Sequence, residues 1–423
     1  MPKRLNARRP APALLAMLLL GCSGLPVETV PNPRSIEHPS EATVAAVDAV
    51  LQAIDDQYPR SRPLSEETRR RIREIADDHP KLVRQILDTL DVAAPADGAR
   101  LVRAVGALGA DAAEAVPKLM ELRFGGGELA AVAAAALADM GPPAVRAYSE
   151  KVRHGGPREA AASAAALASP QLLPYSGEAG PVLRERMTQQ EDVDDLLEWA
   201  RYAAAVSSSP ERFRGEYRDI SPMSDKAPAA VNEIYAEFRQ SREAQAVLSS
   251  IRTAADSEDI NIAFKAVQLL PLFGVPAEQA VPSAVQLYAR AAREDELGLG
   301  AVGFFQFFAA YGRAAVPPLI TLATSGDDAL VRKVAVGFLA LRDPMGENRS
   351  ALSPEVVPTL IKVLMNDRNA DVRGAAISAL SAIWPSTDLT IDALQQASVN
   401  DDSVEVRAKA KAALKRIADA AQE

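Results

Sequence analysis

A pattern that returns about every 35 residues constrains the fold of this chain more than any single motif. Five segments between residues 256 and 423 share an apolar anchor, an alanine four residues later, and a leucine or phenylalanine four residues after that. Positions i, i+4 and i+8 lie on one face of an α-helix, and a small residue at the centre lets a neighbouring helix approach closely. Each segment therefore predicts a helix packed against another helix. The anchors are Ile262, Leu297, Val331, Val372 and Val406, the alanines are Ala266, Ala301, Ala335, Ala376 and Ala410, and the third positions are Leu270, Phe305, Leu339, Leu380 and Leu414.

Another helix is predicted before each of these segments, so that each segment is the second helix of a pair. The stretches "AVPSAVQLY" from Ala280, "AVPPLITLA" from Ala315 and "VVPTLIKVL" from Val356 each place a proline near the first turn, where its missing N–H has no cost. Polar turns such as Asp327-Asp328 and Asp401-Asp402 precede the second helix and can cap it. The predicted unit is therefore helix, turn, helix.

These units resemble the HEAT-repeat family, including the shorter variant found in phycobilisome-lyase-like proteins. The resemblance is carried by Asp371 to Leu380, by Ser403 to Leu414 and by the Ala-Val-Pro starts. It covers 256–423 well and 95–170 more weakly, where the leucines at 108, 137 and 167 return about every 30 residues. The resemblance implies an α-solenoid, and such solenoids serve many roles. The composition agrees with an all-α fold, because 48% of the residues are hydrophobic while only 5% are aromatic.

The N-terminus predicts export. A basic region, Lys3 to Arg9, precedes the apolar run Ala11 to Leu20, which is too short to span a bilayer at about 20 residues per crossing. The following Leu19-Leu20-Gly21-Cys22 resembles the lipobox of bacterial lipoproteins. The resemblance implies cleavage before Cys22, lipidation of its thiol, including an acyl chain such as palmitate, and anchoring to a membrane. Because Ser23 follows and not aspartate, the family pattern favours the outer membrane, facing the periplasm. The alternative is an ordinary signal peptide with an incidental cysteine.

The chain is thus divided into five predicted parts. These are a lipoprotein signal peptide (1–21), the lipidated cysteine with a proline-rich flexible tether (22–40), N-terminal helical and HEAT-like repeats (41–185), an irregular helical segment with a long loop (186–255), and C-terminal HEAT-like repeats (256–423).

Charge and cysteine content narrow the possible partners. The formal net charge is −9, and removal of the first 21 residues, with four basic residues and no acid, would leave −13. This charge disfavours nucleic acid and anionic lipid surfaces as partners. A single cysteine permits neither an intramolecular disulfide nor a cysteine-rich metal site, and we expect no cofactor and no metal.

Two motifs have a plain structural interpretation. The sequence from Gly298 to Gly303 matches G-x-G-x-x-G, but no strand precedes it and Ala301 falls on the alanine position of the repeat, so we favour a helix over a dinucleotide site. The aromatic cluster from Phe304 to Phe308 predicts core packing, with a groove for a partner as the alternative.

Two sets of residues are candidates for partner binding. Arg332, Arg373 and Arg407 each follow the anchor of a repeat by one position. They form either a ladder that pairs with acids of their own or the adjacent repeat, or a basic line that meets an acidic partner. The second set lies in the stretch 207–228, which is either a linker or a binding loop for protein or glycan. Its members are Arg212, Phe213, Arg214, Tyr217 and Arg218.

These observations favour a lipid-anchored scaffold or adaptor of the cell envelope that binds another protein through the solenoid surface. The chain has no G-x-S-x-G motif and its three histidines share no ligand spacing, so we do not expect an enzyme. The alternative is an enzyme, or a subunit of one, that acts on envelope material with acids gathered on the concave face. A weaker third possibility is a structural spacer between membrane and cell wall.

Overall fold

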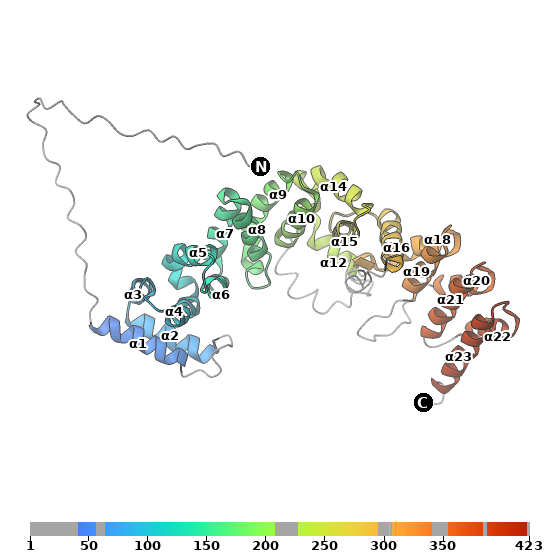
Figure 1. Cartoon of the computed structure of the whole chain (residues 1–423), viewed down its shortest axis with the longest axis horizontal. Coiled ribbons are helices and arrows are strands. Elements are labelled where there is room, and N and C mark those ends of the chain that lie inside the picture. The colour runs from blue at the N-terminus through green and yellow to red at the C-terminus, as the bar shows by residue number, and fades with distance from the viewer. Residues whose placement is uncertain are drawn as a thin grey trace, which may run out of the picture.

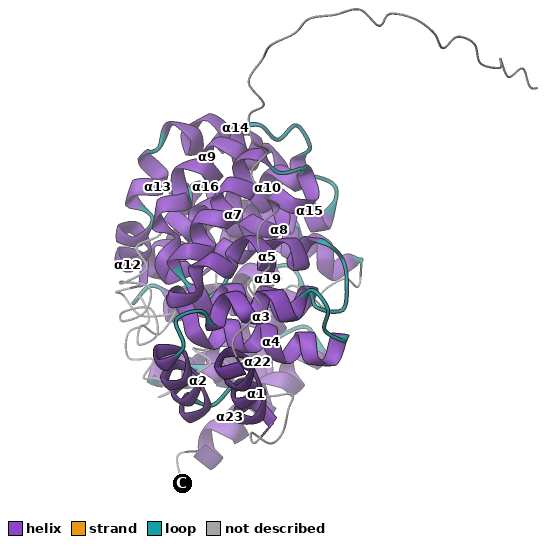
Figure 2. Ribbon diagram, turned by 90° about the vertical axis from the view of Figure 1, so that its left-hand side faces the viewer, coloured by secondary structure: helices purple, strands orange, loops and turns teal. Residues whose placement is uncertain are grey.

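The protein is an arc of helices that follow one another in chain order, from α1 at one end to α23 at the other (Figure 1). The computed structural model describes residues 41–55, 64–207, 227–294, 304, 307–308, 310–340, 354–383 and 387–420. Within these ranges every regular element is a helix, and a view from the α1 end shows helices joined by loops (Figure 2). The all-α solenoid expected from the repeat is confirmed.

The N-terminal part of the arc comprises ten α-helices and two 3₁₀ segments among the described residues. They are α1 (Glu41–Asp55), α2 (Glu66–Asp78), α3 (Leu82–Leu90), α4 (Pro95–Leu108), η1 (Gly109–Ala115), α5 (Val116–Phe124), α6 (Ala130–Met140), α7 (Pro142–His154), α8 (Pro157–Leu167), η2 (Leu173–Ala179), α9 (Gly180–Thr188) and α10 (Val193–Ser207).

The C-terminal part continues the arc with the same kind of element. Its described helices are α12 (Ala227–Ile234), α13 (Ala236–Gln240), α14 (Arg242–Ala255), α15 (Ile260–Leu269), α16 (Ala277–Arg293), η4 (Gly312–Ala315), α18 (Val316–Ser325), α19 (Ala329–Leu339), α20 (Val356–Asn366), α21 (Ala370–Ala382), α22 (Asp388–Asn400) and α23 (Val404–Ala420).

The C-terminal helices stack in two layers. The pairs α18 and α19, α20 and α21, and α22 and α23 form hairpins. The first helices α18, α20 and α22 contact one another in sequence, and so do the second helices α19, α21 and α23. A continuous apolar core lies between the layers, because each helix buries one face against its hairpin partner and other faces against adjacent repeats.

The small residue at the centre of each repeat lies where the helices meet. Ala266, Ala335, Ala376 and Ala410 are all completely buried, which confirms the phase of the repeat at these four positions. In the remaining copy, the three pattern positions Leu297, Ala301 and Phe305 lie outside the described residues. In the N-terminal half, the leucines at 108, 137 and 167 are also buried, as the weaker copies predicted.

Local chemistry explains where several helices begin. The side chains of Ser65 and Asp328 accept hydrogen bonds from backbone N–H groups in the first turns of α2 and α19, as a helix cap does. Pro317 lies at the start of α18 as expected. The expected start at Ala280 is wrong: α16 begins at Ala277, and Pro282 lies inside the helix, where it has no N–H to donate to the carbonyl oxygen of Glu278.

The aromatic cluster is part of the core. Phe304, Phe307 and Phe308 are buried, and the ring of Phe304 packs edge-on against Tyr288 with centroids 5.1 Å apart. The ring of Phe308 lies 4.3 Å from that of Phe338, on α19. This contact confirms the core interpretation for the described phenylalanines.

Several predictions concern residues outside the described ranges. They are Cys22 with the signal and tether, the Gly298 to Gly303 motif, and the loop residues Arg212, Phe213, Arg214, Tyr217 and Arg218. Among the helices that the structure describes, none is both long enough and apolar enough to span a bilayer.

Candidate functional site: an arginine ladder and the groove beside it

Arg332, Arg373 and Arg407 occupy the same place in three successive repeats. Each is the fourth residue of a second helix, namely α19, α21 and α23. The cap residues four positions before them, Asp328 and Asn369, accept two backbone N–H groups each, and Ser403 accepts one. The caps fix the first turn of each helix, and so they fix the direction in which the arginine leaves it.

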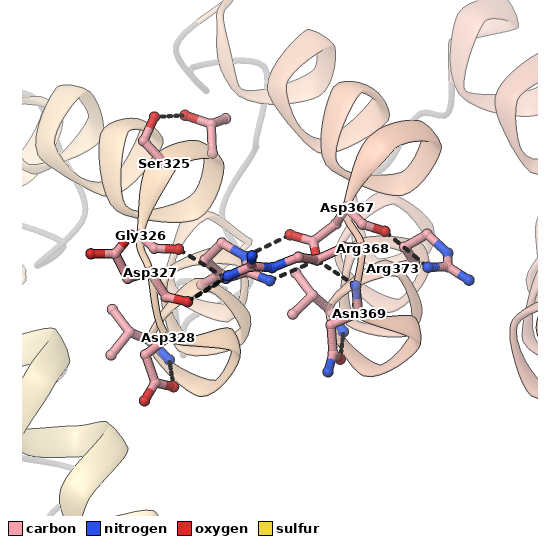
Figure 3. Close-up of polar contacts among 12 residues, drawn as sticks. Ser325, Gly326, Asp327, Asp328, Asp367, Arg368, Asn369 and Arg373 are labelled. Atoms are coloured by element: carbon pink, nitrogen blue, oxygen red, sulfur yellow. Dashed lines mark hydrogen bonds and ion pairs between the residues drawn. The ribbon is translucent and has the colours of Figure 1, made fainter.

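Arg332 connects two repeats through both edges of its guanidinium. Its Nε and Nη2 donate to the Oδ2 and Oδ1 of Asp367 in the next repeat, at 2.7 and 3.0 Å. Its Nη1 donates to the carbonyl oxygens of Gly326 and Asp327 in its own repeat, at 2.8 and 3.1 Å. Figure 3 shows the two turns, at Gly326 and at Asp367, that these bonds connect. The two side chains are only 5% and 6% exposed, so this is a buried, bidentate ion pair.

Arg373 repeats this arrangement one step along the array. Its Nε and Nη2 donate to the Oδ2 and Oδ1 of Asp401, at 2.7 and 2.8 Å, and its Nη1 donates to the carbonyl oxygen of Asp367, at 2.9 Å. Asp367 therefore accepts from Arg332 with its side chain and from Arg373 with its backbone (Figure 3). These linked contacts form the arginine ladder: Arg332, Asp367, Arg373 and Asp401.

Each ladder aspartate also closes its own turn. Oδ1 of Asp367 accepts a hydrogen bond from the backbone N–H of Asn369 at 2.8 Å. Oδ1 of Asp401 accepts one from the backbone N–H of Ser403, also at 2.8 Å. The bonds from Arg373 are the main cause that lowers the pKa of Asp401. For Asp367, burial raises the pKa, but the bonds from Arg332 and Asn369 outweigh it and the pKa is lowered. Both carboxylates are thus held in the charged form.

Arg407 has the same pose but a different environment. Its Nη1 donates to the carbonyl oxygens of Asp401 and Asp402, at 2.5 and 3.1 Å, as in the other two repeats. Among the described residues, no carboxylate reaches its Nε and Nη2 edge. Arg332 and Arg373 therefore pair with acids of the adjacent repeat, which is the first of the two alternatives that the sequence offered. Arg407 has no such carboxylate among the described residues.

The ladder aspartates occupy a fixed position in the repeat, and this position could have identified them from the sequence. Asp367 and Asp401 stand six residues before Arg373 and Arg407, while Gly326 stands six residues before Arg332. The repeat before Arg332 has Gly298 and not an arginine at the equivalent position. An aspartate at this position thus occurs only where the preceding repeat supplies an arginine to pair with it.

An open groove lies beside the first step of the ladder. It has a volume of about 340 Å³ and runs between the C-terminal ends of α18 and α20. Arg332 and Asp367 are among its lining residues, which also include Ser325, Asp327, Lys362, Asn366 and Arg368. Arg368 also donates to the carbonyl oxygen of Asp327 across the groove. Such a polar, solvent-open surface suits contact with another protein better than enclosure of an apolar ligand.

Comparison with known proteins agrees with this architecture. A family model described as HEAT repeats matches residues 316–415, which are the repeats that contain the ladder. No curated protein matches the chain. HEAT repeats are commonly scaffolds for protein interaction, so the fold suits the binding of a protein partner.

Proposed function

We propose that this protein is a lipid-anchored scaffold or adaptor of the bacterial cell envelope, and that its solenoid binds another envelope protein. The observation that carries the proposal is the stack of HEAT-like repeats, in which the arginine ladder fixes the register of one repeat on the next. A stack held in register offers a continuous, preorganised surface, and preorganisation lowers the entropic cost of binding.

Anchoring and localisation in this proposal derive from the sequence. The lipobox-like Leu19 to Cys22 and the proline-rich stretch that follows support a mature protein attached at Cys22 and held off the membrane. Ser23 supports the outer membrane, with the solenoid in the periplasm. A role in binding and not in catalysis is supported by the ladder, because Asp367 and Asp401, its two buried carboxylates, are both already paired with arginine.

The anchoring half of the proposal is tested with Cys22→Ser. We expect this variant to leave the membrane fraction and to unfold at the same temperature as the wild type, because the anchor precedes the helices. Ser23→Ala is the matched control and should stay with the membrane. If Cys22→Ser remains in the membrane after alkaline washing, lipid anchoring is wrong.

The scaffold half is tested by crosslinking in intact cells followed by purification of the full chain. We expect one or a few envelope proteins to be recovered, with crosslinks on the helices of the solenoid. If crosslinks fall only on residues 22–40, or if no protein is recovered, the solenoid is not a binding surface.

A further inference from the structure

The face of α21 that carries Arg373 is covered by the next repeat. At four-residue steps from Arg373 lie Ile377 and Ser381, on the same side of the helix. Arg373 contacts Asp401, in the turn before α23, and the Ser381 hydroxyl accepts from Arg416 Nη2 of α23 at 3.3 Å. Ile377 lies between these two contacts and is 1% exposed. This stripe of α21 is therefore an interface with a helix.

The equivalent stripe of α23 is entirely basic. It consists of Arg407, Lys411 and Lys415, and the two lysines are exposed. Lys411 occupies the position of Ile377 in α21 and of the buried Val336 in α19. The substitution of an apolar residue by lysine indicates that an ordinary HEAT repeat does not cover this face, because a buried lysine would need a charged partner.

The charge of α23 contrasts with that of the chain. The helix has five basic and two acidic residues, hence a net charge of +3, in a protein with a net charge of −9. Two of the five basic residues face the array: Lys409 lies against Gly374, and Arg416 reaches Ser381. The three others form the stripe. None of them has a carboxylate partner among the described residues.

Arg407 is also preorganised to receive a carboxylate. Its Nη1 holds the carbonyl oxygens of its own turn, as the Nη1 atoms of Arg332 and Arg373 do, and in those two arginines the opposite edge binds an aspartate in a bidentate fork. The cost of ordering the side chain is therefore already met within the turn, and a carboxylate at the free edge would form two charge-assisted hydrogen bonds.

From these contacts we infer that the stripe Arg407, Lys411 and Lys415 docks an acidic helix of a partner protein. A helix is the occupant that this face receives in the repeat before, and the three cations span about 12 Å at 1.5 Å per residue. The partner helix presents carboxylates at four-residue steps, with an acid at the level of Arg407. This inference rests on the proposed scaffold function and names the surface and the chemistry of the partner.

A purely solubilising stripe is the competing explanation. The outer face of the end repeat in a solenoid is commonly polar, and lysines near the C-terminus of a helix interact favourably with its dipole. That explanation requires the stripe to be charged. It does not require the charges to lie at particular positions, nor Arg407 to present a bidentate fork. The two explanations therefore differ in their sensitivity to geometry.

The test is a titration of the full-length protein, solubilised from the membrane, with two labelled alanine-based helical peptides. The aligned peptide has an aspartate and three glutamates at four-residue steps, and the control peptide has the same composition with the acids distributed around the helix. Fluorescence anisotropy is measured at low salt and at 0.3 M NaCl. We expect the aligned peptide to bind more tightly, and binding to weaken with salt, because these pairs are exposed.

Variants of the stripe separate fork geometry from bulk charge. Arg407→Gln should weaken binding of the aligned peptide about fivefold, and the triple variant Arg407→Gln, Lys411→Gln, Lys415→Gln about tenfold or more. Arg407→Lys keeps the charge but loses the fork, so it should also weaken binding, whereas Lys411→Arg should not. Arg158→Gln, an exposed arginine on α8, is the matched control and should bind as the wild type does. Lys411 and Lys415 are exposed and Arg407 is half-buried, and we expect all variants to retain the helical circular dichroism of the parent.

Each alternative outcome would overturn the inference. Equal binding of both peptides, or wild-type binding by Arg407→Lys, would reduce the stripe to unspecific charge. Tighter binding of duplex DNA or of anionic phospholipid vesicles, lost in the triple variant, would assign the stripe to a different class of partner. Self-association in sedimentation that the triple variant abolishes would assign it to a second copy of the chain. The scaffold proposal would survive these outcomes, because crosslinked partners could still map to other repeats.

Discussion

The two halves of the arc hold their repeats in register by different means. In the C-terminal half, buried bidentate pairs connect Arg332 to Asp367 and Arg373 to Asp401 across successive repeats. In the N-terminal half, the ion pairs between elements are more exposed, as in Arg69 with Asp139, whose side chains are 19% and 40% exposed. Register there depends on close approach: a Cβ on Gly106 of α4 would lie 2.8 Å from the Cα of Ala136 on α6.

The difference shows that one repeat architecture can be specified in two ways. Small residues bring two backbones together and tolerate little error in position, because overlap rises steeply at short range. A buried arginine fork specifies register by geometry, although the net contribution of such a pair to stability is modest because both charges lose solvation. Removing one partner is costly in either case, for different reasons.

Both halves have buried alanines where two helices meet, and a charge at such an alanine should lower the free energy of unfolding more than any other change. Ala376→Glu and Ala136→Glu each place a charge where two helices meet, and we expect each to lower the free energy of unfolding by about 5 kcal/mol or more. Urea unfolding monitored by circular dichroism measures this loss. Ala418→Glu on the exposed side of α23 is the control and should change little. Wild-type stability of Ala376→Glu would mean that the repeat has been assigned the wrong phase.

Breaking the ladder should destabilise only the C-terminal half. Asp367→Ala leaves Arg332 buried without a carboxylate, and we expect a loss of about 3–5 kcal/mol. Asp139→Ala removes the exposed partner of Arg69 and should cost less than about 1 kcal/mol. Hydrogen exchange should locate the loss of protection in α18 to α21. Equal effects of the two substitutions would contradict the distinction between the halves.

Acid should weaken the ladder in the same region. The pKa values of Asp367 and Asp401 are lowered in the folded state, so their stabilising contribution is complete above the unfolded pKa of about 4. It is lost as the pH falls from about 4 through the lowered values. Unfolding between pH 6 and pH 2.5 should begin in the C-terminal half, with a smaller loss than in Asp367→Ala because a protonated carboxyl still fills the site. Prior loss of the N-terminal half would contradict this order.

Close approach is tested by adding one methyl group. Gly106→Ala should cost about 1–3 kcal/mol, because the new Cβ would overlap the backbone of α6. Gly374→Ala is the matched change in the C-terminal half, where the Cβ meets only the flexible Lys409 side chain, at 3.0 Å. There, the gain in helix propensity should offset the contact, and stability should stay within about 0.5 kcal/mol of the parent. Thermal unfolding of both variants measures the difference.

Much of the fold follows from local sequence. The central alanines predicted the helix faces, and the acidic turn at Asp328 predicted a helix start, because these signals act within one or two turns of the chain. The start of α16 was misplaced because the prediction placed the proline in the first turn of the helix, whereas Pro282 lies inside the helix, five residues after its first residue.

The ladder shows what the sequence left open. The sequence supplied the arginines, the acidic turns and two alternatives for the use of the arginines. It could not select the acid that each arginine binds. Asp367 lies 35 residues from Arg332, and Asp401 lies 28 residues from Arg373. Which turn reaches which guanidinium depends on the offset between stacked repeats, and that offset is a property of long-range packing.

The sequence by itself determined that this protein is a helical repeat array, because small residues at a fixed period can bury a continuous core only by stacking. Only the tertiary structure decided that Arg332 and Arg373 are used within the array while the carboxylate edge of Arg407 meets no acid of the described residues. The physical reason is that burial and pairing depend on how the adjacent repeat packs against each arginine, which the Val-Arg pair common to the three helices does not specify.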